Sequence, residues 1–387
     1  PASGTAGGHY VSLSTWEADY GGIDFAALGA GRGNLVTAQR IAVAECYNDW
    51  PTGMNSGYML IDGWVVDANH YLRIYTPLSE RHSGKLRVSE PAGAYTGFTM
   101  RITLSNAPQI RCQTSYTRID GIAFDSYSGG SGDGHAMVNA VYSTYISNCL
   151  FNASSGDSRW GLSAYDSSYI SNCILINSGD GGFVLWGDST AVNCTAIGAA
   201  SGFTGGGTFI NCLAYNNTDN FNVSGTVRYS AANDADIPAD ATNRASQTFA
   251  FRDASAKDYH LAATDTGARG YGVQTSYAWE DIDGDLRSAD NVWDIGADQY
   301  TPVGTVPEKV SLIRAGQTIS NIVRNNNTVA VTLSGAYPNN NLKVGQKIRI
   351  SGVSDESFNG VYAIASYDTT NYDDFTFVQA GPNAGPI

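Results

Sequence analysis

The residues STYISNCLFN, at positions 143–152, decide the fold, because close variants of them recur three more times along the chain. The copies are SSYISNCILIN at 167–177, STAVNCTAIG at 189–198 and GTFINCLAYN at 207–216. Each carries the dipeptide Asn-Cys, and the successive cysteines are 24, 21 and 18 residues apart. A repeat of this period predicts a stack of similar structural units, and the falling spacing predicts units that taper along the axis.

Aligning the copies on the cysteine separates inward from outward positions. The position three before the cysteine holds Ile146, Ile170, Ala191 and Phe209, and the position two after it holds Phe151, Leu175, Ala196 and Ala214. Inward residues at these positions and at the cysteine break strict strand alternation, so the chain must bend between them. Asparagine suits that bend, because it tolerates left-handed backbone. The predicted structural ladder is Asn148, Cys149, Asn172, Cys173, Asn193, Cys194, Asn211 and Cys212.

A strand, a bend and a second strand, repeated with like residues in register, describe a solenoid of parallel strands. Stacking buries the inner faces that no coil can bury alone. These residues resemble those of right-handed parallel β-helix proteins of the pectate-lyase-like architecture, which have an asparagine ladder at one corner. The resemblance implies an all-β fold, with the β-helix over residues 35–300 and an N-terminal cap region over residues 1–34.

Residues 9–20, HYVSLSTWEADY, predict a short amphipathic helix that covers the open end of the solenoid. Ser12 or Ser14 is the expected N-cap, and Leu13 and Trp16 share the face that would be buried. The first coils that follow are wider. One of their connections, LSERHSGKLRVSEPAGAY at 78–95, is long enough that we expect it to project.

Two later segments resemble the closing part of bacterial and phage β-helix proteins. FAFRDASAKDYHLAATDTGARGYG, at 249–272, resembles the closing coil, in which an Asp-Tyr-His-Leu-like strand precedes a glycine turn. WEDIDGDLRSADNVWDIGADQY, at 279–300, resembles the ending that follows it. The resemblance is informative about fold and nearly silent about activity.

The last part of the chain differs in pattern. Residues 301–308, TPVGTVPE, predict a linker, and residues 309–387 alternate short apolar and polar runs between Asn and Gly turns. This pattern predicts a small all-β sandwich or barrel. Residues 310–380 resemble a small β module of tailed-phage virion proteins. The resemblance implies attachment to other virion proteins, of the capsid or the tail, through this domain.

Composition restricts the partners. The net charge of −14 argues against binding to nucleic acid, which requires a basic face. No run of 18 apolar residues predicts a membrane span, and the first residues, PASGTAGGHY, do not form a signal peptide, so we expect a virion location after synthesis in the host cytoplasm. Four of the six cysteines fall in one inward column, which predicts buried thiols, although three disulfides are an alternative.

The outward positions of the aligned coils carry the candidate site residues. Asp166 and Asp188 fall on adjacent coils, where they are either an acid/base pair or solvated turn residues. Tyr165 and Trp186 share an outward column and predict either a platform for sugar rings, such as a host-surface glycan, or a packing surface for a loop or a further copy of the chain.

Metal and nucleophile motifs are weak in this sequence. Asp281, Asp283 and Asp285 alternate as in a calcium loop, but the twelve-residue loop with its closing Glu is absent. We therefore expect a structural turn and no metal site here, with calcium binding as the alternative. The loop 125–135 holds Asp133 and His135, which gives a second, weaker catalytic candidate. Because no complete zinc, phosphate-loop or nucleophile motif is present, we expect no cofactor.

Three functions compete. The first is a non-enzymatic structural or adhesive virion protein of a tailed bacteriophage, such as a capsid or tail decoration, a fibre or a spike subunit. The second is a polysaccharide-degrading lyase or glycosidase of the tailspike type, acting on the outer face of the β-helix. The third is a bacterial surface adhesin, which would need a signal peptide or anchor. We favour the first, because the C-terminal module resembles virion proteins and no catalytic motif is complete.

Overall fold

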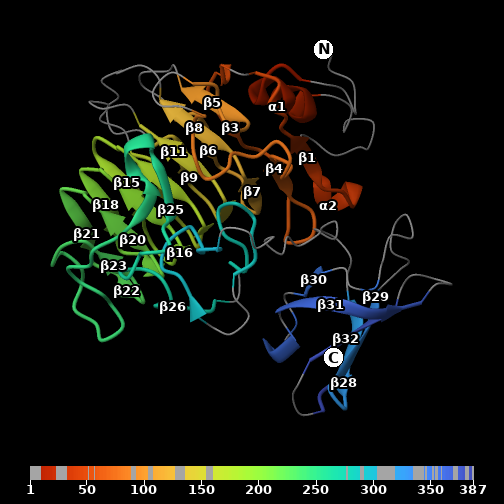
Figure 1. Ribbon diagram of the computed structural model, residues 1–387. Coiled ribbons are helices and arrows are strands. Elements are labelled where there is room, and N and C mark those ends of the chain that lie inside the picture. The colour runs from red at the N-terminus through yellow and green to blue at the C-terminus, as the bar shows by residue number, and fades with distance from the viewer. Residues whose placement is uncertain are drawn as a thin grey trace. The chain divides into compact units, whose positions relative to one another are not determined.

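A computed structural model describes most of the chain (Figure 1). The residues described are 10–22, 33–50, 52–55, 57–88, 93–102, 108–126, 136–153, 160–275, 278–287, 292–302, 319–333, 344, 347–350, 353, 356–358, 360–368, 374–379 and 383–385. The chain divides into two compact units. The first comprises Pro1–Gln274, Glu280–Asp283 and Arg287–Val303, and the second comprises Thr275–Trp279, Gly284–Leu286 and Gly304–Ile387. Within the described part, no helix combines the length and the apolar character needed to cross a membrane.

Three long parallel sheets build the first unit, and their strands follow one another in rotation. The first sheet contains β1 (Ala42–Glu45), β4 (Leu72–Tyr75), β7 (Thr117–Asp120), β10 (Thr144–Ser147), β13 (Tyr169–Ser171), β16 (Thr190–Val192), β19 (Thr208–Ile210) and β22 (Thr226–Arg228). The second contains β2 (Met54–Asn55), β5 (Thr99–Ile102), β8 (Ala123–Ser126), β11 (Leu150–Asn152), β14 (Ile174–Ile176), β17 (Thr195–Ile197), β20 (Leu213–Tyr215) and β23 (Ala231–Ala232). The third contains β3 (Met59–Ile61), β6 (Ile110–Cys112), β9 (Val138–Ala140), β12 (Leu162–Ala164), β15 (Gly181–Leu185), β18 (Ser201–Gly205) and β21 (Asp219–Val223). The predicted right-handed parallel β-helix is confirmed.

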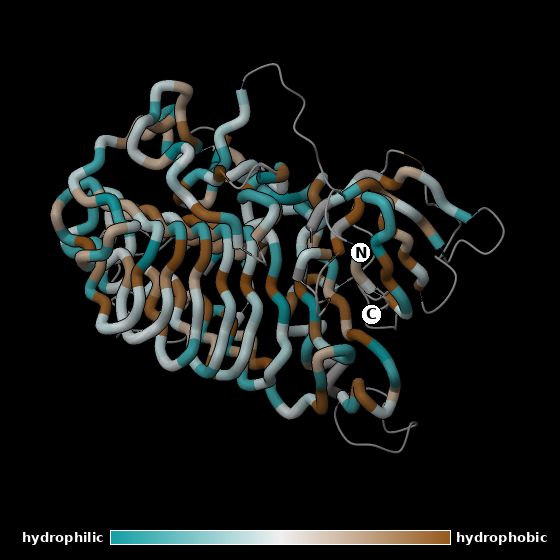
Figure 2. Tube along the Cα trace, turned by 90° about the horizontal axis from the view of Figure 1, so that it is seen from below, coloured by the Kyte–Doolittle hydropathy of each residue, from teal (hydrophilic) through white to brown (hydrophobic). Residues whose placement is uncertain are grey.

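Side chains of like type stack inside the solenoid, whose coils appear as a row of ribs in Figure 2. The register pairs Ile146 with Ile170 in the first sheet, and Phe151 with Leu175 in the second. Phe203 stacks on Phe221 at a ring-centroid distance of 4.9 Å. Such offset aromatic stacking adds to the burial of apolar area. All six cysteines are free and buried in this interior, where a thiol acts as a small apolar group.

The asparagines of the repeat form the bend between the first and second sheets. Asn148, Asn172, Asn193 and Asn211 have φ between 51° and 53°, the left-handed region expected for this residue type. Their side chains bond from coil to coil: the Asn172 amide donates to Asn148 Oδ1 over 3.2 Å, and that of Asn211 donates to Asn193 Oδ1 over 2.8 Å. The ladder therefore satisfies polar groups that the stacking of coils would otherwise bury unpaired.

The N-terminal end is covered as expected. Helix α1 (Leu13–Gly22) is capped by Ser12, whose Oγ accepts from the Thr15 amide, and Leu13 and Trp16 join the core of the solenoid. Trp16 stacks on Trp64 at a ring-centroid distance of 6.5 Å. A second, one-turn helix, α2 (Leu35–Ala38), has Asn34 as its N-cap.

The long connection, residues 78–95, does not project where it is described, so that expectation was wrong. Arg81 pairs with Asp120 over 2.7 Å, and His82 Nε2 donates to the Asn148 carbonyl over 2.9 Å. Further on, Arg87 pairs with Asp125 over 2.7 Å. These contacts hold the connection against the solenoid. They give the buried Asp120 and Asp125 a positive partner in addition to the hydrogen bonds from the next coil.

The closing segment, defined as residues 249–274, 280–283 and 287–300, does not add a further coil. Its strands β24 (Phe251–Asp253) and β25 (Asp258–Leu261) pair antiparallel around the 3₁₀ turn η2 (Ala254–Ala256). Strands β26 (Gly272–Val273) and β27 (Val292–Trp293) also pair antiparallel. The parallel coils end at β23, so the expected closing coil at 249–272 is wrong.

The segment instead packs on the outer face of the second sheet. Ile282 and Ala297 cluster with the outward residues Ile174, Ile176 and Ile197. The Ala297 amide donates to Thr195 Oγ1 over 2.9 Å. These outward positions are apolar. Burying them under the closing segment removes apolar area from water and stabilises the fold, whereas a further coil would leave that area exposed.

The second unit contains a five-stranded antiparallel sheet in the order β28, β29, β32, β31, β30. Its strands are β28 (Ile319–Asn325), β29 (Thr328–Leu333), β30 (Lys347–Ile350), β31 (Gly360–Tyr367) and β32 (Asp374–Val378), with the 3₁₀ turn η4 (Glu356–Phe358). Asn326 and Asn327, both at positive φ, form the two-residue turn between β28 and β29, as in type I′ hairpins. Phe358, Phe375 and Phe377 lie in the core of this small β domain, which confirms its predicted class.

Candidate functional site

The structure brings the predicted aromatic pair together on the outside of the solenoid. Tyr165 and Trp186 follow β12 and β15, whose register pairs Ala164 with Leu185. The Trp186 amide donates to the Ala164 carbonyl over 2.9 Å, which extends the pairing of β12 and β15 by one residue. Tyr165 is half-buried and Trp186 is 42% exposed.

A third exposed aromatic residue follows β9, one register position beyond the column of Tyr165 and Trp186. Tyr142 lies one coil earlier, is 45% exposed, and its carbonyl accepts from Ser168 Oγ over 3.3 Å. The three residues Tyr142, Tyr165 and Trp186, named here the aromatic corner, span consecutive coils. In the aligned repeats Tyr142 stands in the same column as Asp166, so the sequence alone did not group it with Tyr165 and Trp186.

Asp166 and Asp188 lie beside the aromatic corner and are both exposed. Asp166 has left-handed backbone with φ 50°, and its carbonyl accepts from Ser143 Oγ over 2.6 Å. Within the described residues, neither carboxylate has a hydrogen-bond or ion-pair partner that would fix its position. A general acid or base is normally held in place by such partners, so the two residues have the surroundings of solvated turn residues.

Aromatic and cationic side chains continue onto the first sheet. Tyr145 in β10 is 42% exposed, and the Arg118 guanidinium lies 5.6 Å from its ring centroid and 3.6 Å from that of Tyr71. Arg73 similarly lies 4.0 Å from the Tyr75 ring centroid. Arginine stacked on tyrosine presents a flat amphipathic surface with hydrogen-bond donors at its edge.

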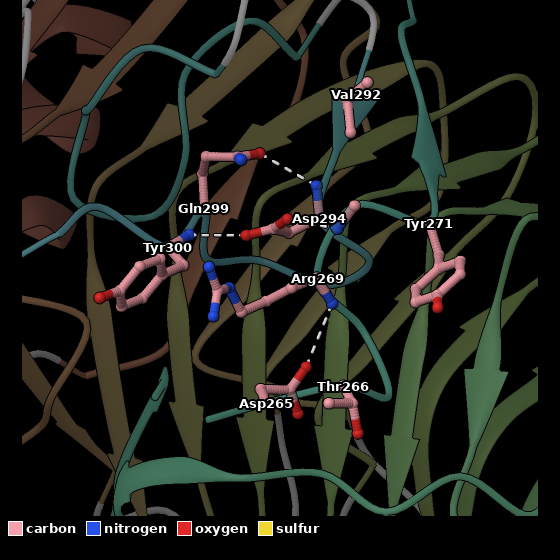
Figure 3. A pocket seen from close by; sticks show the side chains of 9 residues that line it. Asp265, Thr266, Arg269, Tyr271, Val292, Asp294, Gln299 and Tyr300 are labelled. Atoms are coloured by element: carbon pink, nitrogen blue, oxygen red, sulfur yellow. Dashed lines mark hydrogen bonds between the residues drawn. The ribbon is translucent and has the colours of Figure 1, made fainter. Parts of the chain in front are cut away.

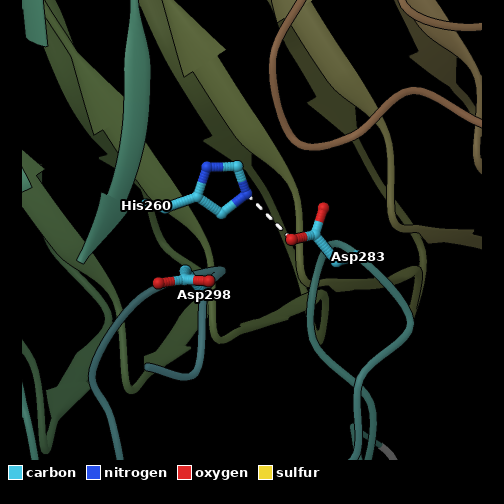
Figure 4. A group of neighbouring side chains, drawn as sticks. All are labelled: His260, Asp283 and Asp298. Atoms are coloured by element: carbon cyan, nitrogen blue, oxygen red, sulfur yellow. Dashed lines mark ion pairs between the residues drawn. The ribbon is translucent and has the colours of Figure 1, made fainter. Parts of the chain in front are cut away.

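A different cluster, at the base of the closing segment, contains His260, Asp283 and Asp298 (Figure 4). His260 Nδ1 lies 2.5 Å from Asp258 Oδ1, and Nε2 lies 2.9 Å from Asp283 Oδ2. Asp298 Oδ2 accepts from the Leu261 amide over 2.7 Å. His260 is almost completely buried, at 2% exposure.

Burial and charge shift the titration of these groups in opposite directions. Burial alone lowers the pKa of His260, but its contacts with Asp258 and Asp283 outweigh burial and raise the pKa well above its usual value. Burial raises the pKa of Asp298 to about 6, and the charge of Asp283 adds to that effect. Burial also acts to raise the pKa of Asp283, but contact with His260 dominates and lowers it.

The three aspartates whose alternation resembles a calcium loop have separate roles. Asp281 is buried and accepts from the backbone amides of Asp283 and Gln299 over 3.0 and 3.1 Å, whereas Asp283 faces His260. Asp285 is also buried. Sequence reasoning missed His260 and Asp298, although both stand in the quoted segments DYHL and DIGAD.

A hollow in the closing segment is lined by Asp265, Arg269, Tyr271, Asp294 and Tyr300, among others (Figure 3). Asp265 accepts from the Ala268 amide over 2.8 Å, and Asp294 accepts from the Gly270 and Tyr300 amides, each over 2.7 Å. These carboxylates hold turns of the closing segment. Asp133 and His135, the remaining candidates, lie outside the described residues.

Comparison with known proteins adds no relative: no protein-family model and no curated protein matches this chain.

Proposed function

We propose that the chain is a non-enzymatic adhesive or structural subunit of a tailed-phage virion, and that it presents a rigid β-helix whose aromatic corner contacts a glycan of the host surface. The carrying observation is that Tyr142, Tyr165 and Trp186 lie on consecutive coils and that two of them are more than 40% exposed. Exposed aromatic side chains on a rigid support commonly contact sugar rings or partner proteins.

The rigidity of the support favours this role. Strands above and below fix each backbone position in the corner, and the interior beneath it is closely packed, with Phe183 stacked on Phe203 at 5.4 Å. A surface held in this way loses little conformational freedom on binding. Binding in this account needs no catalytic group, in agreement with the solvated positions of Asp166 and Asp188.

The virion assignment rests on the small β domain. Residues 310–380 resemble a module of tailed-phage virion proteins, and the domain has its own core, which includes Ile322, Ile348 and Phe377. A domain with a separate core can serve as an attachment module while the β-helix remains available to the host.

Two experiments test the proposal. Binding of the full chain to isolated bacterial surface polysaccharides should fall at least tenfold in Trp186→Ala and Tyr165→Ala. Tyr58→Ala, which removes an exposed tyrosine elsewhere on the solenoid, is the matched control and should leave binding unchanged. Equal binding by all variants would refute the glycan role, and absence of the chain from purified virions would refute the virion assignment.

A further inference from the structure

The cluster at the base of the closing segment joins three parts of the chain that are far apart in sequence. His260 comes from β25, Asp283 from residues 280–283, and Asp298 from the end of the segment. One ligand atom from each lies within 4.8 Å of the others. This spacing is that of donors around a single metal ion, because ligands about 2 Å from an ion lie roughly 3 to 4 Å apart.

Two buried atoms of this cluster that could ligate a metal ion lack hydrogen-bond partners. His260 Nε2 and Asp283 Oδ1 are both shielded from solvent and make no hydrogen bond, although Nε2 is ion-paired with Asp283 Oδ2. Asp283 Oδ2 is only 2.9 Å from Nε2, but it lies off the direction of a ring N–H, so the contact is not a hydrogen bond. A buried polar atom without a partner carries a desolvation cost that a bound cation would remove.

The other ring nitrogen of His260 is already committed. Nδ1 lies 2.5 Å from Asp258 Oδ1, and the backbone amide of His260 lies 3.4 Å from the same oxygen. A carboxylate on one ring nitrogen fixes the tautomer and orients the opposite nitrogen toward a metal. The contact of Asp258 with Nδ1 therefore leaves Nε2 in the orientation of a metal ligand.

The backbone of the long connection approaches the cluster closely at Gly84. Gly84 has φ +65°, and a Cβ there would lie 2.4 Å from His260 Nε2 and 3.2 Å from Asp283 Oδ1. Any larger residue would therefore clash with the His260 ring. Glycine at this position permits the close approach of the two segments.

Charge also favours a cation. Three carboxylates, those of Asp258, Asp283 and Asp298, act on the His260 imidazole, and the charge of Arg252 also acts on Asp258 and Asp283. The buried Arg287 directs its guanidinium to the carbonyls of Gly296 and Ala297 and to Asn172 Oδ1 rather than to these carboxylates. A divalent ion would balance the excess negative charge.

We propose that His260 Nε2, Asp283 and Asp298 bind one divalent transition-metal ion of the Zn²⁺ type, with Asp258 as the positioning residue for His260. One nitrogen and two carboxylate donors suit Zn²⁺, whereas Ca²⁺ and Mg²⁺ take oxygen ligands. A water molecule would complete the coordination. The ion would hold the parts of the closing segment together, because its three ligands come from three stretches of that segment.

Metal content and affinity test the site directly. The full chain, stripped with a chelator and dialysed, is titrated with Zn²⁺ and separately with Co²⁺, whose visible absorption reports tetrahedral nitrogen and oxygen ligation. We expect one ion per chain, and a rise in Tm on addition of Zn²⁺ that EDTA reverses. His260→Gln and Asp298→Asn should abolish binding, and Asp258→Asn should weaken it about 10- to 100-fold with unchanged stoichiometry.

His70→Gln is the matched control, because His70 also pairs with an aspartate, Asp67, but outside the cluster. It should bind Zn²⁺ as the wild type does. Asn at position 298 keeps an oxygen acceptor for the Leu261 amide, so that variant is expected to fold even if His260→Gln does not. Failure of the folded wild type to bind Zn²⁺ or Co²⁺, or equal binding by Asp298→Asn, would show that the cluster is an ion triad and overturn the proposal.

Discussion

Two outward faces of the same solenoid differ in what covers them. On the second sheet, Ile174, Ile176 and Ile197 point outward and are buried under the closing segment. At the turn between the third and first sheets, Tyr142 and Trp186 also point outward, but both remain more than 40% exposed. The solenoid thus has apolar side chains on both outer faces. Among the described residues, those on the second sheet are covered by the closing segment, whereas Tyr142 and Trp186 are not. The face left open is the one available to a partner.

The largest effect should come from charge on the covered face. Ile197→Asp would bury a carboxylate among Ile176, Ile282 and Ala297, and should lower the free energy of unfolding by roughly 3 to 5 kcal/mol. Thr208→Asp, on the outer side of the first sheet, is the matched control and should change it by less than about 0.5 kcal/mol. Urea denaturation measures both, and a similar loss in the two variants would mean that the closing segment does not seal the second sheet.

A somewhat smaller loss of stability is expected when the closing segment loses its contact with Asn172 at the asparagine bend. Arg287→Met removes the bonds to Asn172 Oδ1 and to the Gly296 and Ala297 carbonyls, and should cost about 3 kcal/mol because those acceptors stay buried. Arg252→Met, on an exposed part of the same segment, is the control. Hydrogen exchange should show faster opening of residues 292–300 in Arg287→Met alone, and unchanged protection there would contradict the contact.

Stability should also depend on pH through His82, which anchors the long connection. Burial and the neighbouring Arg81 lower its pKa to about 4, only partly offset by Asp283, the Asn148 carbonyl and Asp120. Nε2 donates to the Asn148 carbonyl and Nδ1 accepts from the Gly84 amide, so the folded state holds the ring neutral.

The unfolded state takes up a proton on His82 near pH 6.5 and the folded state only near pH 4. The contribution of His82 to the free energy of unfolding is therefore fully present above about pH 6.5. About 2 to 3 kcal/mol of it is lost as the pH drops toward 4. The wild type should lose more than His82→Gln over this window in denaturation at several pH values. Parallel curves for the two proteins would contradict the assignment.

The smallest change in stability is expected at the open face. Trp186→Ala should lower the free energy of unfolding by about 1 to 2 kcal/mol, because Trp186 is 42% exposed and only its buried part loses contacts. Phe203→Ala, in the interior directly inside this face, should cost about 3 to 5 kcal/mol. A large loss in Trp186→Ala would mean that the ring is a packing residue, which is the alternative interpretation of the aromatic pair.

The inward columns and the asparagine bend were predictable because the repeat places each of them four times at fixed spacing. Phe151, Ile170 and Asn172 needed no tertiary information. The closing segment was not predictable in the same way, because its contacts join distant positions once only. Arg287 and Asn172 are 115 residues apart, and His260 meets Asp283 and Gly84 through no shared period. The sequence contained those residues, but no pattern indicated that they would converge.

The central claim is that the aromatic corner binds and the neighbouring carboxylates do not catalyse. The most direct test is to incubate the full chain with each surface polysaccharide that it binds and to assay the release of reducing ends. We expect binding that depends on Trp186 and no release of reducing ends above background, in the wild type and in Asp166→Asn and Asp188→Asn alike. Release by the wild type that disappears in either aspartate variant would contradict it and identify the chain as a depolymerase.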